Sequence, residues 1–130
     1  MVATKNSASP LAGLSEQALA HVAEYFQALA DPMRLRILNT LRSGEHNVGE
    51  LTELCGCSTA NVSRHLAALA KQGMVGRESR GTSVYYSIAD ASIYALCDLV
   101  CCNIARQFEQ QASVHKSFTK ATQKRGRNHP

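Results

Sequence analysis

Cysteine is the residue type in this sequence most capable of specific chemistry. The chain of 130 residues has five cysteines, an odd number that does not suit a framework of structural disulfides. A hydrophobic fraction of 45% is enough for one core without covalent cross-links. We therefore expect metal-binding, redox or packing roles in a reducing compartment. The five are Cys55, Cys57, Cys97, Cys101 and Cys102.

Cys101 and Cys102 are neighbours in a segment whose apolar spacing predicts a helix. Cys101 lies at the edge of the apolar stripe, and Cys102 lies about 100° further round, in a direction that core packing does not require. Two adjacent thiolates can share one large soft ion, although they are poorly placed for a disulfide with each other. Because thiolates prefer soft metals and metalloids, the pair predicts a site for trivalent arsenic or antimony.

The number of thiolates required separates two forms of the expected arsenic ligand. Methylated trivalent arsenic has two exchangeable positions, which Cys101 and Cys102 would fill. Inorganic arsenite has three and would need another thiolate, from Cys97 or from a second chain. Cys97 lies within the apolar stripe, where packing alone explains it, so both forms stay open.

Cys55 and Cys57 flank Gly56 at a predicted turn. Free cysteine behaves as a small hydrophobe, so packing of the turn is the favoured interpretation. An auxiliary thiol site is the alternative.

The spacing of apolar residues predicts four helices in the first part of the chain. Two of them are short and joined by a turn at Gly56, where a positive φ is expected, which indicates a helix-turn-helix. The predicted ranges are 15–29 with Ser15 as N-cap, Pro32–Arg42 with Asp31 as N-cap, a short helix around Val48–Leu54, and Ser58–Gly73 with Ser58 as N-cap.

Two β-prone runs, Met74–Glu78 and Ser83–Ile88, predict a hairpin with a basic tip at residues 79–82. Asp90 then caps a last helix, about Ala91–Gln111, which is long and apolar for a small domain and is expected to pack against a second copy. The expected organisation is a flexible N-terminus over 1–14, one domain over 15–112 and a basic flexible tail over 113–130.

The net charge of +4 comes from the end of the chain, because residues 114–130 hold five basic residues and no acidic ones. We expect this tail to add weak, salt-sensitive attraction to polyanions. No apolar run is long enough to span a membrane, and no secretory signal is recognised at the N-terminus. A cytoplasmic location is expected.

A helix-turn-helix followed by a hairpin is a DNA-binding layout, with the second helix in the major groove and the hairpin along the backbone. Arg64 could reach guanine, Asn61 could pair with adenine, and short hydroxyl side chains could contact phosphates. The predicted partner is therefore double-stranded operator DNA. The predicted contacts are Ser58, Thr59, Asn61, Ser63, Arg64, His65, Arg77 and Arg80.

The chain also resembles a known family over residues 16–111. The matching segments are Ala28–Leu38, Ser58–Leu66 with Leu69, Gly73–Val75 and Arg80–Tyr86. They resemble the ArsR/SmtB family of winged-helix repressors. The resemblance implies a mainly α fold with a small β-hairpin, a homodimer built from the first and last helices, and release of the operator when an inducer binds. No cofactor is expected for DNA binding itself.

Two inducer sites known in this family do not fit the sequence. The zinc pattern begins the last helix with Asp-x-His, but Asp90 is followed by Ser92, and Asn103 and Arg106 stand at the later ligand positions. The arsenic pattern opens the third helix with Cys-x-Cys, where this chain has Asn47 and Gly49. The thiols of the last helix are therefore the predicted sensor.

Other functions of the same thiols stay open. A redox or persulfide sensor would use the cysteines without any metal, and a cadmium or lead sensor would need three or four ligands. An enzyme is not expected, because the five histidines are scattered and no motif places a base beside a nucleophile.

Overall fold

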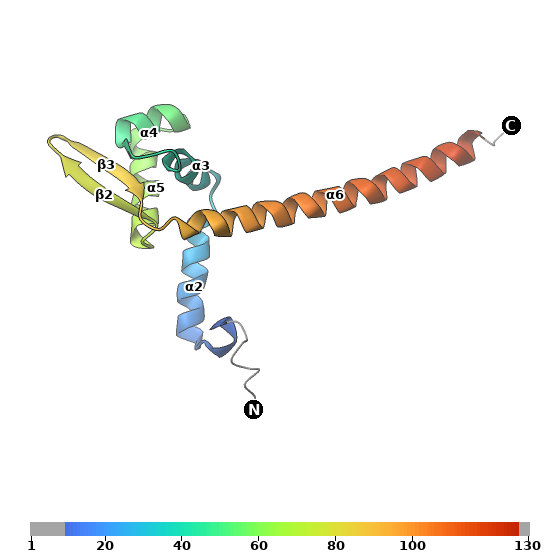
Figure 1. Ribbon diagram of the computed structural model, residues 1–130, viewed down its shortest axis with the longest axis horizontal. Coiled ribbons are helices and arrows are strands. Elements are labelled where there is room, and N and C mark those ends of the chain that lie inside the picture. The colour runs from blue at the N-terminus through green and yellow to red at the C-terminus, as the bar shows by residue number, and fades with distance from the viewer. Residues whose placement is uncertain (1–9, 128–130) are drawn as a thin grey trace. The chain divides into compact units, whose positions relative to one another are not determined.

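The computed structural model describes residues 10–127, with side chains described as far as residue 123. Two compact units divide at Asp90 and Ala91. The first holds a short 3-10 helix, four α-helices and a small sheet, and the second is one helix (Figure 1). The elements are η1 (Pro10–Gly13), α2 (Glu16–Leu29), α3 (Pro32–Leu41), β1 (His46–Asn47), α4 (Val48–Cys55), α5 (Thr59–Lys71), β2 (Val75–Arg80), β3 (Ser83–Ile88) and α6 (Ser92–Arg127).

Side-chain caps start the helices where the sequence predicts them. Ser15 Oγ accepts the backbone N–H of Ala18 before α2, and Ser58 Oγ accepts that of Asn61 before α5. Asp31 Oδ1 accepts the N–H of Met33 at 2.8 Å, directly before Pro32 opens α3. These interactions confirm the predicted starts, because each satisfies a backbone donor that the helix itself leaves unpaired.

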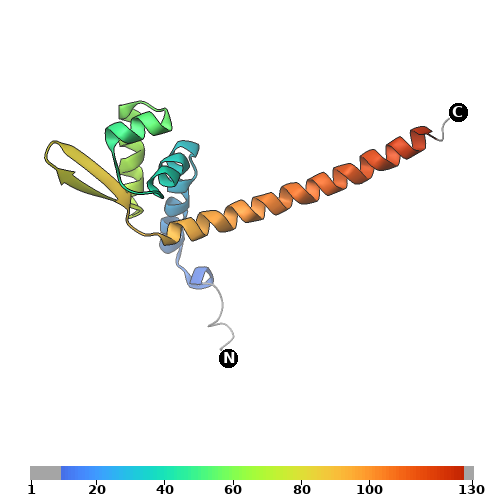
Figure 2. The same ribbon diagram turned by 45° about the horizontal axis from the view of Figure 1, so that its top comes forward.

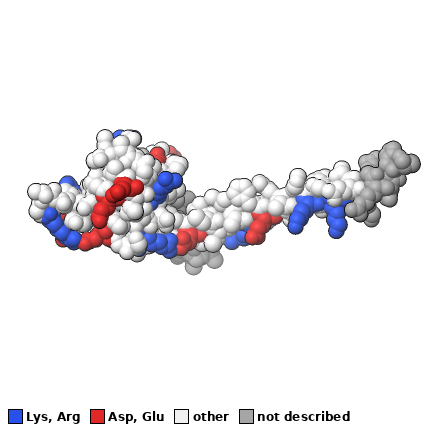
Figure 3. Space-filling model, turned by 90° about the horizontal axis from the view of Figure 1, so that it is seen from above, with Lys and Arg blue, Asp and Glu red and all other residues white. Residues whose placement is uncertain are grey.

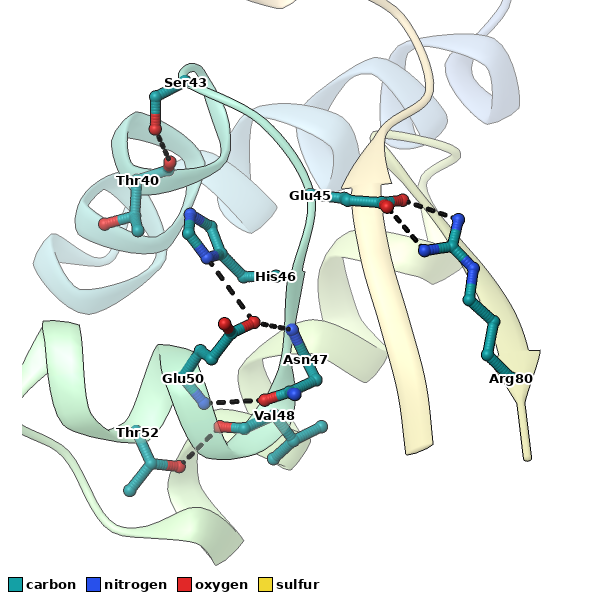
Figure 4. A network of polar contacts seen from close by, with 9 residues as sticks. All are labelled: Thr40, Ser43, Glu45, His46, Asn47, Val48, Glu50, Thr52 and Arg80. Carbon is teal, nitrogen blue, oxygen red and sulfur yellow. Dashed lines mark hydrogen bonds and ion pairs between the residues drawn. The ribbon is translucent and has the colours of Figure 1, made fainter. Parts of the chain in front are cut away.

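The start of α4 carries a capping box that the sequence reading missed. Asn47 Oδ1 accepts the N–H of Glu50 at 2.8 Å, and Glu50 Oε1 accepts the N–H of Asn47 at 2.9 Å (Figure 4). Gly56, with φ of 66°, ends α4 and leads into α5. The predicted helix-turn-helix is thus α4–Gly56–α5, and the turn uses the left-handed conformation that glycine adopts without strain.

The sheet is antiparallel with strand order β1-β3-β2. Strand β2 reaches Arg80 rather than the predicted Glu78, since Arg80 pairs with Ser83 and leaves Gly81 and Thr82 as the turn, whereas β3 has the predicted bounds. The predicted tip at residues 79–82 is therefore too long. Strand β1 was not predicted, because two residues paired with Tyr85 and Tyr86 show no alternation of their own.

The core of the first unit is built from α2, α3, α4, α5 and the start of β2. Helices α3 and α5 each contact both α2 and α4, and β2 packs against α5 (Figures 1 and 2). Its members are mostly aliphatic and almost fully buried, as expected for the apolar faces of amphipathic helices. They are Ala28, Ile37, Leu38, Leu41, Leu51, Cys55, Val62, Leu66, Leu69, Met74 and Val75. This packing holds α5 in place and leaves its other face exposed.

The last helix, α6, is much longer than predicted. It runs from Ser92 to Arg127 over 36 residues, so the segment 113–127, expected to be a flexible tail, is helical. Val114 and Phe118 continue the apolar spacing of Ile104 and Phe108, and lysine, glutamine and alanine between them favour helix. The prediction of Ala91–Gln111 stopped too early because it overlooked this continuation.

Exposed apolar side chains follow one face of α6. Val100, Ile104 and Phe108 are 44–64% exposed, and their spacing of four places them on one side of the helix. None of the described helices is long and apolar enough to cross a membrane. The mainly helical fold with a small antiparallel sheet confirms the predicted fold class.

Candidate functional site

Helix α5 presents a polar face to solvent at the position expected of a recognition helix. Thr59, Asn61, Ser63 and Arg64 are exposed on it, while Val62 is fully buried. Arg64 Nη2 donates to Asn61 Oδ1 at 2.9 Å, so the two longest of these polar side chains lie together. The arrangement provides the donors and acceptors that read base edges in a major groove.

His65 does not belong to this exposed face. It is only 6% exposed, and its Nδ1 accepts a hydrogen bond from Arg34 Nε at 3.1 Å. The expectation that His65 faces outward is therefore wrong. Its spacing of three from Val62 and four from Leu69 places it on the core side of α5, a signal that the sequence already contained.

Arg34 and Asp31 complete a polar link between α5 and the start of α3. Arg34 Nη1 also donates to the carbonyl of Ala28 at 3.5 Å, near the end of α2. Asp31 Oδ1 lies 4.0 Å from His65 Nε2. The backbone N–H of Arg34 holds the pKa of Asp31 below its ordinary value, so this carboxylate is ionised at neutral pH. The link ties the recognition helix to the junction of α2 and α3.

The two basic residues predicted on the wing differ in their surroundings. Arg77 is exposed in β2, and its side chain forms no hydrogen bond or ion pair with a described residue. Arg80 is bound by two carboxylates, Glu45 and Glu78. On the face drawn in Figure 3, basic and acidic side chains alternate over the first unit. Glu45 was not singled out from the sequence, because its partner lies 35 residues away.

Cys55 is a packing residue. It is 1% exposed, its Sγ lies 3.7 Å from Thr40 Oγ1, and its carbonyl accepts from Arg36 Nη1 at 3.3 Å. Cys57 is half-buried at the turn. The structure agrees with the packing interpretation for Cys55 and leaves Cys57 partly accessible.

Cys101 and Cys102 are both exposed on α6, and Cys97 is half-buried one turn earlier. In the part of the chain that the structure describes, no three histidine, cysteine or acidic side chains come close enough together to hold a metal ion. The described residues of one chain therefore offer an adjacent pair of free thiols rather than a complete set of three ligands. Such a pair suits a ligand with two exchangeable positions.

Comparison with known proteins places this fold in a family. Residues 31–76 match the family described as bacterial regulatory protein, arsR family. The HTH-type transcriptional regulator NmtR of Mycobacterium tuberculosis is 42% identical over 89 residues, which are 68% of this chain and 74% of that protein. A probable mercury resistance operon repressor of Streptomyces lividans is 38% identical over 80 residues, or 62% and 64% of the two chains.

Solved structures agree with these sequence matches. The crystal structure of Mycobacterium tuberculosis Rv0081 has a TM-score of 0.69 and 33% identity, covering 75% of this chain and 99% of that one. The homodimeric winged helix-turn-helix DNA-binding domain of Mycobacterium bovis Mb0332 has a TM-score of 0.65 and 33% identity, with 76% and 94% covered. The chain therefore belongs to the arsR family of DNA-binding transcriptional regulators, in which the winged helix-turn-helix binds DNA.

Proposed function

We propose that this protein is a homodimeric repressor that leaves its operator when a trivalent arsenical binds the thiolates of Cys101 and Cys102. The observation that carries the proposal is the exposure of both thiols on consecutive positions of α6. A reactive cysteine must be accessible, and these two side chains are exposed whereas Cys55 is buried. Action in the cytoplasm, where thiols are kept reduced, is part of this proposal.

DNA is bound by the exposed face of α5, with Arg77 of the wing on the phosphate backbone. The homodimeric state of the Mb0332 domain supports a two-fold assembly. Two recognition helices related in this way would enter successive major grooves about 34 Å apart and require a roughly palindromic operator. The buried link from His65 to Arg34 holds α5 in the orientation that this contact needs.

Methylated trivalent arsenic fits the adjacent pair best. Each of its two hydroxyl groups leaves as water with the proton of one thiol, and two As–S bonds replace two As–O bonds without any change of oxidation state. Inorganic arsenite exchanges three positions and needs a third sulfur. Because Cys97 forms no three-ligand cluster with the pair among the described residues, that sulfur would come from a rearranged Cys97 or from the partner chain.

Release follows if the bound arsenical changes how the last helices pack across the dimer and so alters the spacing of the recognition helices. A hundredfold loss of operator affinity requires a coupling free energy of about 2.7 kcal/mol, which is within the usual range for allosteric proteins. The exposed apolar face of α6 provides the surface on which such repacking would act.

The test is operator release, measured by fluorescence anisotropy of labelled DNA, with methylarsenite, arsenite, antimonite, cadmium and polysulfide in parallel. We expect methylarsenite to release DNA from the wild type and not from Cys102→Ser. Full release from that variant would disprove the site. Release by polysulfide alone, reversed by dithiothreitol, would show a redox sensor instead.

A second candidate inducer is mercury. It is favoured by the 38% identity to the Streptomyces lividans protein named as a probable mercury resistance operon repressor. Mercury(II) also prefers thiolate ligands, and two of them would occupy the same pair. Mercury therefore belongs in the titration, and release at lower concentrations than methylarsenite would identify it as the better inducer.

A further inference from the structure

The wing holds a compact cluster of charges around Arg80, the last residue of β2. Arg80 Nε donates to Glu78 Oε1 at 2.6 Å. Arg80 Nη1 and Nη2 donate to the two carboxylate oxygens of Glu45, at 2.5 and 2.9 Å (Figure 4). The guanidinium carbon also lies 4.8 Å from the centre of the Tyr85 ring. Carboxylates therefore bind two edges of the Arg80 guanidinium, and the Tyr85 ring lies against one of its faces.

This arrangement uses most of the hydrogen-bonding capacity of Arg80. A guanidinium has five N–H donors; the hydrogen bonds from Nε, Nη1 and Nη2 all go to carboxylates, and Nη2 also forms an ion pair with Glu78. The hydrogen bond from Arg80 lowers the pKa of Glu45, which keeps this partner ionised at neutral pH. One cation and two anions leave the cluster with a charge of −1, so it does not attract phosphate.

The cluster is also accessible rather than part of the core. The side chains of Arg80, Glu45 and Glu78 are 47%, 43% and 64% exposed. Exposed ion pairs contribute little to the stability of a fold, so neutralising one carboxylate should leave the wing folded. The effect of the cluster on DNA binding can therefore be measured separately from its effect on folding.

We propose that Glu45 and Glu78 sequester Arg80 from the DNA backbone and thereby lower the affinity of the wing for duplex of any sequence. The proposal rests on the proposed position of the wing along the backbone. A phosphate contact carries no sequence information, so a masked arginine lowers the affinity for operator and for non-specific duplex by about the same factor. Glu45 thus sets the overall affinity of the wing for DNA rather than its choice of sequence.

The test compares Glu45→Gln with the wild type on operator and on non-specific duplex across a range of salt concentrations. With one of the two carboxylates that hold Arg80 neutralised, we expect non-specific affinity to rise roughly threefold and the slope of log K against log salt to steepen by up to about 1. Operator affinity should rise by a similar factor, because a phosphate contact carries no sequence information. The double variant Glu45→Gln/Arg80→Gln should lose the gain, because the released cation is gone.

Glu53→Gln is the matched control, since it removes one exposed acid of α4 without touching Arg80. It should leave the salt slope unchanged, and thermal unfolding should show that all variants fold. Unchanged or weaker DNA binding by Glu45→Gln would overturn the proposal, the weaker result meaning that Glu45 orients Arg80 toward phosphate. Response to inducer is measured separately, so failure of the thiol site would not be mistaken for failure here.

Discussion

Cys55 and the pair Cys101 and Cys102 show how one residue type occupies two different environments in one chain. Cys55 closes the turn of the helix-turn-helix, is 1% exposed and lies 3.7 Å from a threonine hydroxyl. The pair on α6 is exposed and adjacent. A buried thiol contributes packing, whereas a thiol that solvent reaches can exchange ligands. Position in the fold, rather than residue type, separates the packing cysteine from the pair proposed to bind the inducer.

The largest expected effect comes from removing one thiol of the exposed pair. Cys102→Ser should bind the operator as the wild type does and lose the whole response to methylarsenite, about a hundredfold change in affinity or 2.7 kcal/mol of coupling. Titration of the DNA complex by anisotropy measures it. Cys57→Ser is the control and should respond normally. If Cys102→Ser and Cys57→Ser respond alike to methylarsenite, the exposed pair is not the site of the inducer.

A substitution at the buried Cys55 should lower the stability of the fold and leave the response to methylarsenite intact. Cys55→Ser places a hydroxyl in an almost fully buried site, and we expect the free energy of unfolding to fall by about 1–3 kcal/mol. Denaturant unfolding measures the loss. At a temperature where this variant remains folded, methylarsenite should still release its operator. A variant of normal stability that no longer responds would instead place the inducer at the turn.

Cys97→Ser sharpens the comparison between the two forms of arsenic. If Cys97 supplies the third sulfur, the variant should require roughly tenfold more inorganic arsenite for half-release, while the response to methylarsenite stays within about twofold. Parallel titrations on one protein preparation measure both. If the responses to arsenite and to methylarsenite weaken equally, Cys97 acts through the packing of α6.

Acid should weaken the first unit through its capping carboxylate. The pKa of Asp31 is lowered from 3.8, chiefly by the hydrogen bond from the backbone of Arg34. The ionised form therefore stabilises the fold above about pH 4, and this contribution is lost as the pH falls below 3.8 toward the pKa in the folded state. Thermal unfolding from pH 6 to pH 3 should show the loss. Asp31→Asn keeps a capping acceptor and should flatten this part of the profile.

Local chemistry made much of the fold predictable. Ser15, Asp31 and Ser58 cap helices by hydrogen bonds to residues two or three positions ahead, and Gly56 adopts the left-handed turn that its place between two apolar runs requires. Adjacency of Cys101 and Cys102 is likewise a property of the sequence itself. Such features need no knowledge of distant contacts.

Features that depend on distant partners escaped prediction. Strand β1 exists because it pairs with β3, Arg80 meets Glu45 across 35 residues, and His65 is buried against Arg34 of another helix. The continuation of α6 past Gln111 is a different case, because the apolar residues Val114 and Phe118 already indicate it in the sequence. A third ligand for arsenite, if contributed by a second chain, lies outside what one sequence can specify.

The most direct test of the thiol sensor is the titration of the operator complex with methylarsenite, carried out side by side on the wild type, Cys102→Ser and Cys55→Ser. The account predicts release from the wild type and from Cys55→Ser, and none from Cys102→Ser. Release from Cys102→Ser at wild-type concentrations of methylarsenite would contradict it.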